Sequence, residues 1–193
     1  MKSEERHKCV VIPIIHSPEG GNKILTVRDK RFKEWTFITG GCRRREIPEP
    51  FKCAMRELDE ETRGTFSVPK QFYKYFKFTT TTRSPEELER DIRENIKVTC
   101  VYHVYIFHMP FQETAQRKTI ARFEEEKEIM ELRKRNKQPI KKSNDENDFI
   151  AFDTYEGFMK KRTWPFIYNH VIIHPEFVPI LNTFFPSNTN DKK

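Results

Sequence analysis

Glycine is scarce in this chain, which has 6 glycines in 193 residues, whereas an average usage of about 7% would give about twice that number. Glycine is required where the backbone has a positive φ angle or where another group approaches the Cα closely. The few glycines are therefore expected to mark tight turns and close contacts. They are Gly20, Gly21, Gly40, Gly41, Gly64 and Gly157.

Long apolar runs and paired cysteines are also missing. No run approaches the roughly 18 apolar residues of a membrane-spanning helix, so no membrane partner is expected. The 4 cysteines include no Cys-x-x-Cys pair, and the charged first eight residues lack the apolar stretch of a signal peptide. Neither a zinc site nor a disulfide framework is signalled, and these absences favour a reducing, cytoplasmic location. The cysteines are Cys9, Cys42, Cys53 and Cys100.

Charge and aromatic side chains are abundant. The formal net charge is +7, 34% of the residues are charged, and 13% are aromatic. The aromatic content excludes a disordered chain. The length fits about one domain, which we assign to residues 1–185, and the polar residues 186–193 are predicted to be a disordered tail.

Strand and helix patterns alternate along the chain without internal repeats or a flexible linker, which predicts an α/β fold. Strands are expected at 9–15, 23–27, 35–39, 72–82, 98–109 and 149–152, the first two joined as a hairpin through 17–22. Helices are expected at 50–63, 84–95 and 113–136, with two short helices between 165 and 185.

Three carboxylates fall on one face of the helix expected at 50–63. Glu57, Glu60 and Glu61 are spaced i, i+3 and i+4, so their side chains lie together and repel one another. A solvated helix face tolerates this repulsion, whereas a metal site uses it, because Mg²⁺ prefers oxygen ligands and often also holds substrate phosphates. The glycine pair after a Trp-containing strand favours the metal site over the solvated face.

These residues resemble the signature of the Nudix hydrolases. That signature runs glycine, five residues, glutamate, seven residues, Arg-Glu-apolar-x-Glu-Glu-x-Gly. Gly41 matches the first glycine, and the helical half matches at Arg56, Glu57, Leu58, Glu60 and Glu61. The resemblance implies an α/β/α sandwich with a mixed sheet between helices, covering about residues 8–160, to which residues 113–143 add a charged helical insertion.

Two departures from the signature affect the loops around the helix. Fourteen residues separate Gly41 from Arg56, where the signature has thirteen, so the loop glutamate is either Glu46 or Glu49 and neither is in register. Arg63 also displaces the second glycine by one position, to Gly64.

The resemblance implies a phosphoanhydride hydrolase that uses Mg²⁺ or Mn²⁺. Glu57, Glu60 and Glu61, together with Gly41, are the implied metal-binding residues, and the same glutamates are catalytic. Arg56 is implied to orient these carboxylates through ion pairs. A general base is still needed.

Glu146 and Asp148, just before the strand expected at 149–152, are the candidates for the base by position, although a solvated acidic loop is the alternative. The candidate substrate-binding residues are basic. Arg43, Arg44 and Arg45 follow the glycine pair and could clamp phosphates.

The segment 113–143 holds ten Lys or Arg and six Glu, a net charge of +4, and a basic segment of this kind is typical of nucleic-acid binding. Lys134 and Arg135 are the residues of this segment that are predicted to bind the substrate. The aromatic strand at 72–82 could stack bases, although alternation places about half of its rings in the core.

These features predict a Nudix pyrophosphohydrolase that removes the 5′ cap of an RNA as a nucleoside diphosphate. The basic segment and the Thr39-Gly40-Gly41-Cys42 loop are similar to Nudix proteins of large cytoplasmic DNA viruses, which would place the protein in a host cytoplasm. One alternative is a small nucleotide substrate, such as a dinucleoside polyphosphate, ADP-ribose or an inositol pyrophosphate. The other is an inactive RNA-binding module on the same fold.

Overall fold

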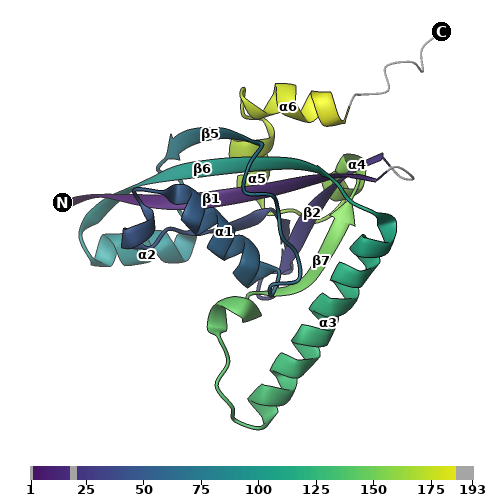
Figure 1. The fold of residues 1–193 in the computed structure, drawn as a ribbon. Helices are drawn as coiled ribbons and strands as arrows, with labels where there is room; N and C mark the ends of the chain where they lie inside the picture. The colour runs from purple at the N-terminus through teal and green to yellow at the C-terminus, as the bar shows by residue number, and fades with distance from the viewer. Residues whose placement is uncertain (1, 18–20, 186–193) are drawn as a thin grey trace.

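A mixed sheet forms the centre of the computed structural model, which describes residues 2–17 and 21–185 (Figure 1). Its main path has the strand order β3-β2-β1-β6-β5, while β4 pairs with β1 and β7 with β2. β1 (Lys2–Ser17) and β6 (Ile96–Pro110) run parallel, and β2 (Gly21–Asp29) is antiparallel to β1. The predicted α/β class with a mixed sheet is confirmed.

The other elements follow the predicted order closely. The remaining strands are β3 (Trp35–Thr36), β4 (Ile38–Gly41), β5 (Tyr73–Thr80) and β7 (Asn147–Asp153). The helices are α1 (Pro50–Glu61), α2 (Pro85–Arg93), α3 (Glu113–Arg135), α4 (Tyr155–Met159), α5 (Pro165–Ile167) and α6 (Phe177–Phe184). Shorter helical turns are η1 (Arg44–Glu46), η2 (Lys142–Asp145) and η3 (Tyr168–Ile172), the last a π-helical turn.

The sheet is covered by helices on both faces because successive side chains of a strand point to opposite sides. Val10 and Ile12 of β1 pack into a core with α4, α5 and α6, whereas Cys9 and Val11 pack into a second core with α1 and Phe123 of α3. The result is a three-layered α/β/α arrangement, in which α1 and α6 lie on opposite faces.

α1 begins at the predicted residue and ends at Glu61, two residues before the predicted end. Pro50 occupies the first helical turn, where its missing N–H is not needed. Cys53, Ala54 and Leu58 are buried against the sheet. The helix is closed by the backbone N–H of Gly64, which has a φ of 68° and donates to the carbonyl of Asp59 (2.8 Å).

Two predicted strands differ from the structure, and one helix was not predicted. β1 begins at Lys2 rather than at residue 9, because the charged N-terminal residues pair in parallel with β6 from Lys2 to His16. The single strand expected at 35–39 is two short strands, β3 on β2 and β4 on β1. α4 is an additional helix. The β1–β2 hairpin is confirmed by the Ser17–Gly21 pair, but residues 18–20 of the predicted turn and the predicted tail at 186–193 lie outside the described residues.

α3 runs beside β7 and then extends away from the sheet, before the chain returns through η2 (Figure 1). It is amphipathic only in part: Phe123 and Met130 are buried, while most of its charged residues face outward. None of the helices in the described part of the chain combines the length and the apolar composition that crossing a membrane requires.

Candidate active site

The glycine loop at the end of β4 lies directly against α1. A Cβ atom on Gly40 would lie 1.9 Å from Cδ of Glu57, so only glycine allows this glutamate its position. A Cβ on Gly41 would meet open space, and the Gly41 carbonyl accepts a hydrogen bond from Nη2 of Arg56 (2.8 Å). The close approach therefore belongs to Gly40, one residue before the glycine that the sequence comparison aligned.

Counting from Gly40 also distinguishes the two possible loop glutamates. Five residues separate Gly40 from Glu46, as in the signature, and the insertion then lies wholly between Glu46 and Arg56. Glu46 is 5% exposed and accepts from Nε (2.8 Å) and Nη2 (2.9 Å) of Arg56 and from the backbone N–H of Arg43 (2.8 Å). The Arg56 hydrogen bonds lower the pKa of Glu46 to about 2. Glu49 is exposed and pairs with Lys52.

Arg56 joins the loop glutamate to the glutamates of α1. Besides Glu46, its Nη1 donates to Oε1 of Glu57 (2.6 Å) and to Oε2 of Glu60 (3.1 Å). These carboxylates raise the pKa of the guanidinium above its ordinary value, so it stays charged. Arg56 thus contacts the loop glutamate and two glutamates of α1 at once, and its orienting role stays a prediction.

Glu57 and Glu61 are buried carboxylates with few positive partners. Burial raises the pKa of Glu57 to about 6, against the opposing effect of Arg56. Burial, and then the charge of Glu57, raises the pKa of Glu61 well above its ordinary value. Glu61 accepts from the backbone N–H of Thr39 and from Nδ2 of Asn147, each at 3.2 Å. A cation bound between these two carboxylates would stabilise their ionised forms.

Glu60 is the most heavily paired of the three glutamates. It is 2% exposed, and burial alone would raise its pKa, but the hydrogen bond from Lys141 (2.9 Å) and the charge of Arg56 lower it. Nη2 of Arg43 also lies 3.3 Å from its Oε1. Lys141 belongs to the basic segment and Arg43 to the arginine run, so both basic regions reach the glutamate helix.

Of the two candidate bases, Glu146 and Asp148, only Glu146 faces the site. Glu146 lines the same cleft as Gly40 and Glu61, and its pKa is raised by partial burial and by the charges of Glu60 and Asp29. Asp148 is held by Arg28 (2.8 and 2.9 Å) and Lys33 (2.5 Å), which outweigh burial and lower its pKa. An ionised carboxylate engaged in this way is a poor proton acceptor.

The other basic residues predicted for the substrate are more scattered. Arg44 and Arg45 are exposed on η1. Lys134 is already paired with Glu131 (2.6 Å) and Asp145 (2.7 Å), whereas Arg135 is exposed on the outer turn of α3. Only Arg43 of the predicted set contacts a glutamate of α1.

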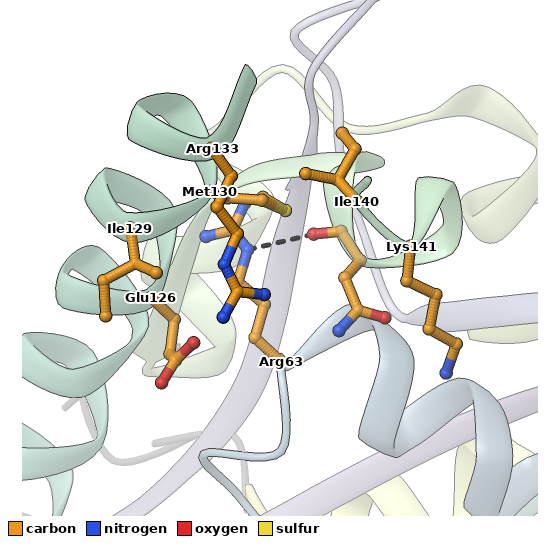
Figure 2. Close-up of a pocket in the computed structure, with 8 residues that line it drawn as sticks. Arg63, Glu126, Ile129, Met130, Arg133, Ile140 and Lys141 are labelled. Atoms are coloured by element: carbon orange, nitrogen blue, oxygen red, sulfur yellow. Dashed lines mark hydrogen bonds between the residues drawn. The ribbon is translucent and has the colours of Figure 1, made fainter. Parts of the chain in front are cut away.

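Arg63 is a feature that the sequence comparison recorded only as a displaced glycine. It has a left-handed backbone (φ 56°), and its buried guanidinium donates to the carbonyls of Asn144 (3.0 Å), Asn147 (2.6 Å) and Phe123 (3.2 Å). It also stacks on the Phe123 ring at 3.9 Å. Figure 2 shows Arg63 between α3 and the segment that carries Ile140 and Lys141. Arg63 therefore fixes the backbone on both sides of Glu146.

A cleft of about 260 Å³ opens beside the glutamates. Its walls include Lys8, Phe32, Gly40, Glu61, Glu146 and Trp164. A second cavity of about 270 Å³ shares Lys8, Ser84 and Trp164 with it and adds Tyr102 and Phe166. The aromatic rings of β5 that were candidates for base stacking line neither cavity: Phe76 is buried, and Tyr73 and Tyr75 pack against Tyr105.

The donor set fits a divalent metal of the Mg²⁺ type. Glu57, Glu60, Glu61 and Glu146 offer carboxylate oxygens, which are hard ligands. The raised pKa values of Glu57 and Glu61 mean that burial disfavours their ionised forms, which a bound cation would stabilise. Glu60 is turned toward Arg56, Arg43 and Lys141, so it must exchange these partners to serve as a ligand. Whether Gly41 contributes its carbonyl stays a prediction.

The comparisons with known proteins identify the family and the fold. The family model described as "NUDIX domain" matches residues 5–151. The NUDIX domain of Shewanella oneidensis NrtR complexed with ADP ribose has a TM-score of 0.51 and 10% identity, and the match covers 83% of this chain and 79% of that one. A chain of the complex between the C-terminal domain of mouse MUTYH and human PCNA has a TM-score of 0.50 and 14% identity, covering 95% and 99%. No curated protein matches by sequence.

Proposed function

Because this chain belongs to the NUDIX domain family, and is thereby a hydrolase of phosphoanhydride bonds, we propose that it cleaves the diphosphate linkage at the 5′ cap of an RNA. The observation that carries the proposal is the contact between Lys141 and Glu60 (2.9 Å). It joins the basic segment 113–143 to the glutamate helix. An RNA whose 5′ end lies at α1 would therefore meet positive charge where the chain leaves the site.

The free positive charge of this segment is greatest near the C-terminal end of α3. Arg133, Arg135, Lys137 and Lys142 are exposed, and none of them forms an ion pair within the described part of the chain. Cations of this kind bind a phosphate backbone without reading its sequence. A small nucleotide has no phosphates to reach them.

The residues of the site divide the reaction between them. Arg43 and Lys141, now on Glu60, are placed to take the phosphate oxygens of the substrate. Arg56 and Glu46 hold the carboxylates of α1 in position. Mg²⁺ or Mn²⁺ bound by Glu57, Glu60 and Glu61 would neutralise the diphosphate and lower the pKa of the attacking water.

Glu146 is the proposed base. It would take the proton of the water that attacks phosphorus, because it lines the cleft and the raised pKa of its carboxyl makes it a stronger proton acceptor than an ordinary glutamate. The bond from that phosphorus to the bridging oxygen then breaks, and the products are a nucleoside diphosphate that carries the cap and an RNA with a 5′-monophosphate. The proposed reaction is cytoplasmic, in a host cell if the chain is viral.

A small nucleotide derivative is the second candidate substrate. Two adjoining cavities of about 260 and 270 Å³, with Trp164 between them, would accept a base and a ribose without any RNA body. The similar NrtR domain was crystallised with ADP ribose, which makes this compound the natural competitor in an assay.

A hydrolysis panel separates the candidates. The substrates are capped RNA, the free cap dinucleotide, ADP-ribose and a dinucleoside polyphosphate, each with Mg²⁺ and with Mn²⁺. We expect replacement of Arg133, Arg135, Lys137 and Lys142 by Gln to lower kcat/KM for capped RNA about 10-fold and to leave the free dinucleotide unchanged. The salt dependence of RNA binding should also flatten by about 0.7 per lost contact.

The matched control has the same change in net charge elsewhere. Lys70, Arg90, Arg93 and Lys97 are exposed and unpaired in the described residues, and their replacement by Gln should leave both substrates unaffected. Equal loss in the two quadruple variants would reject the RNA substrate in favour of a small nucleotide. No turnover of any diphosphate, with RNA binding retained, would instead favour the inactive RNA-binding module.

A further inference from the structure

Three of the four cysteines meet beside the glutamate helix. Cys9 lies on β1, Cys42 follows the glycine loop, and Cys53 lies on α1, and their Sγ atoms are all within 4.8 Å of one another. Long separations along the chain hide this cluster in the sequence. We propose that Cys9, Cys42 and Cys53 form a binding site for a thiophilic cation, Zn²⁺ or Cu⁺, distinct from the carboxylate site.

The spacing of the thiols suits a shared metal ion. With metal–sulfur bonds of about 2.3 Å, sulfur atoms in a tetrahedral site are about 3.8 Å apart. The Sγ atoms of Cys9 and Cys42 are 3.4 Å apart, and no two of the three Sγ atoms are more than 4.8 Å apart. Small side-chain rotations would therefore bring three thiolates to one ion without moving the backbone.

The backbone around the cluster is already fixed. The N–H of Cys42 donates to the carbonyl of His7 on β1 (2.8 Å), and Sγ of Cys9 donates to the carbonyl of Pro50 at the start of α1 (3.1 Å). A site held on a strand, a loop and a helix in this way is preorganised, which reduces the entropy lost when an ion binds.

Burial leaves one side of the cluster accessible. Cys9 and Cys53 are fully buried, whereas Cys42 is partly exposed. In the described residues, no fourth histidine, cysteine or carboxylate joins the group within 4.8 Å. The geometry thus provides three thiolates and one open position, which a Zn²⁺ ion can fill with water or Cu⁺ can leave empty.

The two metal sites differ in ligand chemistry and should not compete. Thiolates select soft ions, whereas the carboxylates of α1 select hard ions such as Mg²⁺. Nη2 of Arg56 lies 3.7 Å from Sγ of Cys53, so its positive charge offsets part of the charge of the thiolates. Binding would release the thiol protons to solvent, and the affinity for the cation should rise with pH.

Cadmium is the direct probe, because cadmium thiolates have an ultraviolet charge-transfer absorption that cadmium carboxylates lack. We expect the reduced full chain, in excess Mg²⁺, to bind one equivalent of Cd²⁺ with this absorption. Zn²⁺, and Cu⁺ supplied through a competing chelator, should displace it in separate titrations. Cys42→Ser should weaken Cd²⁺ binding more than about 10-fold.

Cys100 supplies the matched control. It is buried in the core on the opposite face of the sheet, where its sulfur contacts Arg83, so Cys100→Ser should bind Cd²⁺ like the unchanged chain. If Cys42→Ser does not fold, alkylation of the unchanged chain followed by mass spectrometry gives the answer. The cation should then protect Cys9, Cys42 and Cys53 and leave the labelling of Cys100 unaltered.

Three results would overturn the proposal: no thiolate absorption, equal binding by Cys42→Ser, or a Cys9–Cys42 disulfide with no cation bound by the reduced chain. None of these measurements uses hydrolysis, so their failure leaves the proposed RNA-cap activity untouched.

Discussion

Helices α1 and α3 are both rich in charged residues, yet their charges have different surroundings. The three glutamates of α1 are at most 7% exposed, and each has defined hydrogen-bond partners. On α3, Glu125, Glu126 and Glu128 are exposed, and Lys134 forms ion pairs with two acidic neighbours. Charge density along the sequence therefore does not indicate chemistry. Burial converts the charges of α1 into perturbed pKa values, whereas solvent screens those of α3.

The largest contrast is expected between a glutamate of each helix. Glu61→Gln on α1 should lower the hydrolytic kcat more than about 100-fold, because it removes a proposed metal ligand. It should also raise the thermal midpoint of the metal-free protein at pH 7, because burial disfavours the ionised form of Glu61 and glutamine has no charge to bury. Glu128→Gln on α3 should change neither quantity. Enzyme assays and thermal melts test both, and a Glu61→Gln variant with activity within 10-fold of the unchanged chain would contradict the assignment.

The two loop glutamates give a second comparison between a buried charge and an exposed one, because Glu46 is buried and Glu49 is exposed. Glu46→Gln should reduce the free energy of unfolding by about 3 kcal/mol at pH 7, because it breaks a buried pair with Arg56. Glu49→Gln removes an exposed pair with Lys52 and should cost under about 1 kcal/mol. Urea unfolding measures both changes, and equal effects would show that Glu46 is not the structural partner.

The sign of the pH dependence follows from the lowered pKa of Glu46, about 2 against an ordinary value of 4.5. Its contribution should be present above pH 4.5 and be lost as the pH falls toward 2. The stability difference between the unchanged chain and Glu46→Gln should narrow over that range. A difference that stays constant would contradict the assigned pKa.

Arg63 connects the two regions, so its replacement is the next test. Arg63→Gly would relieve the left-handed backbone but leave three carbonyls, two of them in buried hydrogen bonds, without their donor. We expect the free energy of unfolding to fall by about 2 kcal/mol. Arg63 and Arg133 line one small cavity, with Arg133 on its α3 side. Arg133→Ala should lower the free energy of unfolding by under about 0.5 kcal/mol. Because Arg63 fixes the backbone beside Glu146, Arg63→Gly should also reduce kcat more than it changes KM. Equal stability of the two variants would show that the contacts of Arg63 are dispensable.

The smallest expected effect is on RNA binding by the basic segment 113–143. Lys137→Gln removes an exposed, unpaired charge and should reduce the salt slope by about 0.7. Lys134→Gln should change the slope less, because Lys134 is already paired with Glu131 and Asp145. Binding titrations at several salt concentrations compare them. A larger effect of Lys134→Gln would mean that RNA displaces its acidic partners.

Local patterns predicted the elements whose causes are local. Pro50 and the apolar spacing of α1 identify that helix, and the long β-like run at 98–109 identifies β6, which is buried on both faces of the sheet. The first residues of β1 are strongly charged, and their strand conformation depends on pairing with β6, which local composition does not report. The sequence therefore predicted the layers better than the ends of the strands.

In the site, too, the residues set by local spacing could be predicted, and those set by contacts between distant segments could not. The three glutamates follow from helical spacing, but the choice between Glu46 and Glu49 depends on which carboxylate meets Arg56. Gly40 was distinguished from Gly41 only by its contact with Glu57. The cysteine cluster and the contacts of Arg63 join distant segments, and no spacing in the sequence signals them.

The parallel pairing of β1 and β6 has a consequence for the order of folding. Lys2 pairs with Ile96 and His16 with Pro110, so the central ladder of the sheet closes only after the chain between them has been made. Contacts of such long sequence separation slow folding, because loop closure must precede any gain from pairing. During synthesis, β1 can pair with β2 and β4 before β6 is made, but its other edge, and with it the core against which α1 packs, is completed only by β6. Completion of the hydrolase site is thus tied to a late folding event rather than to the early formation of α1.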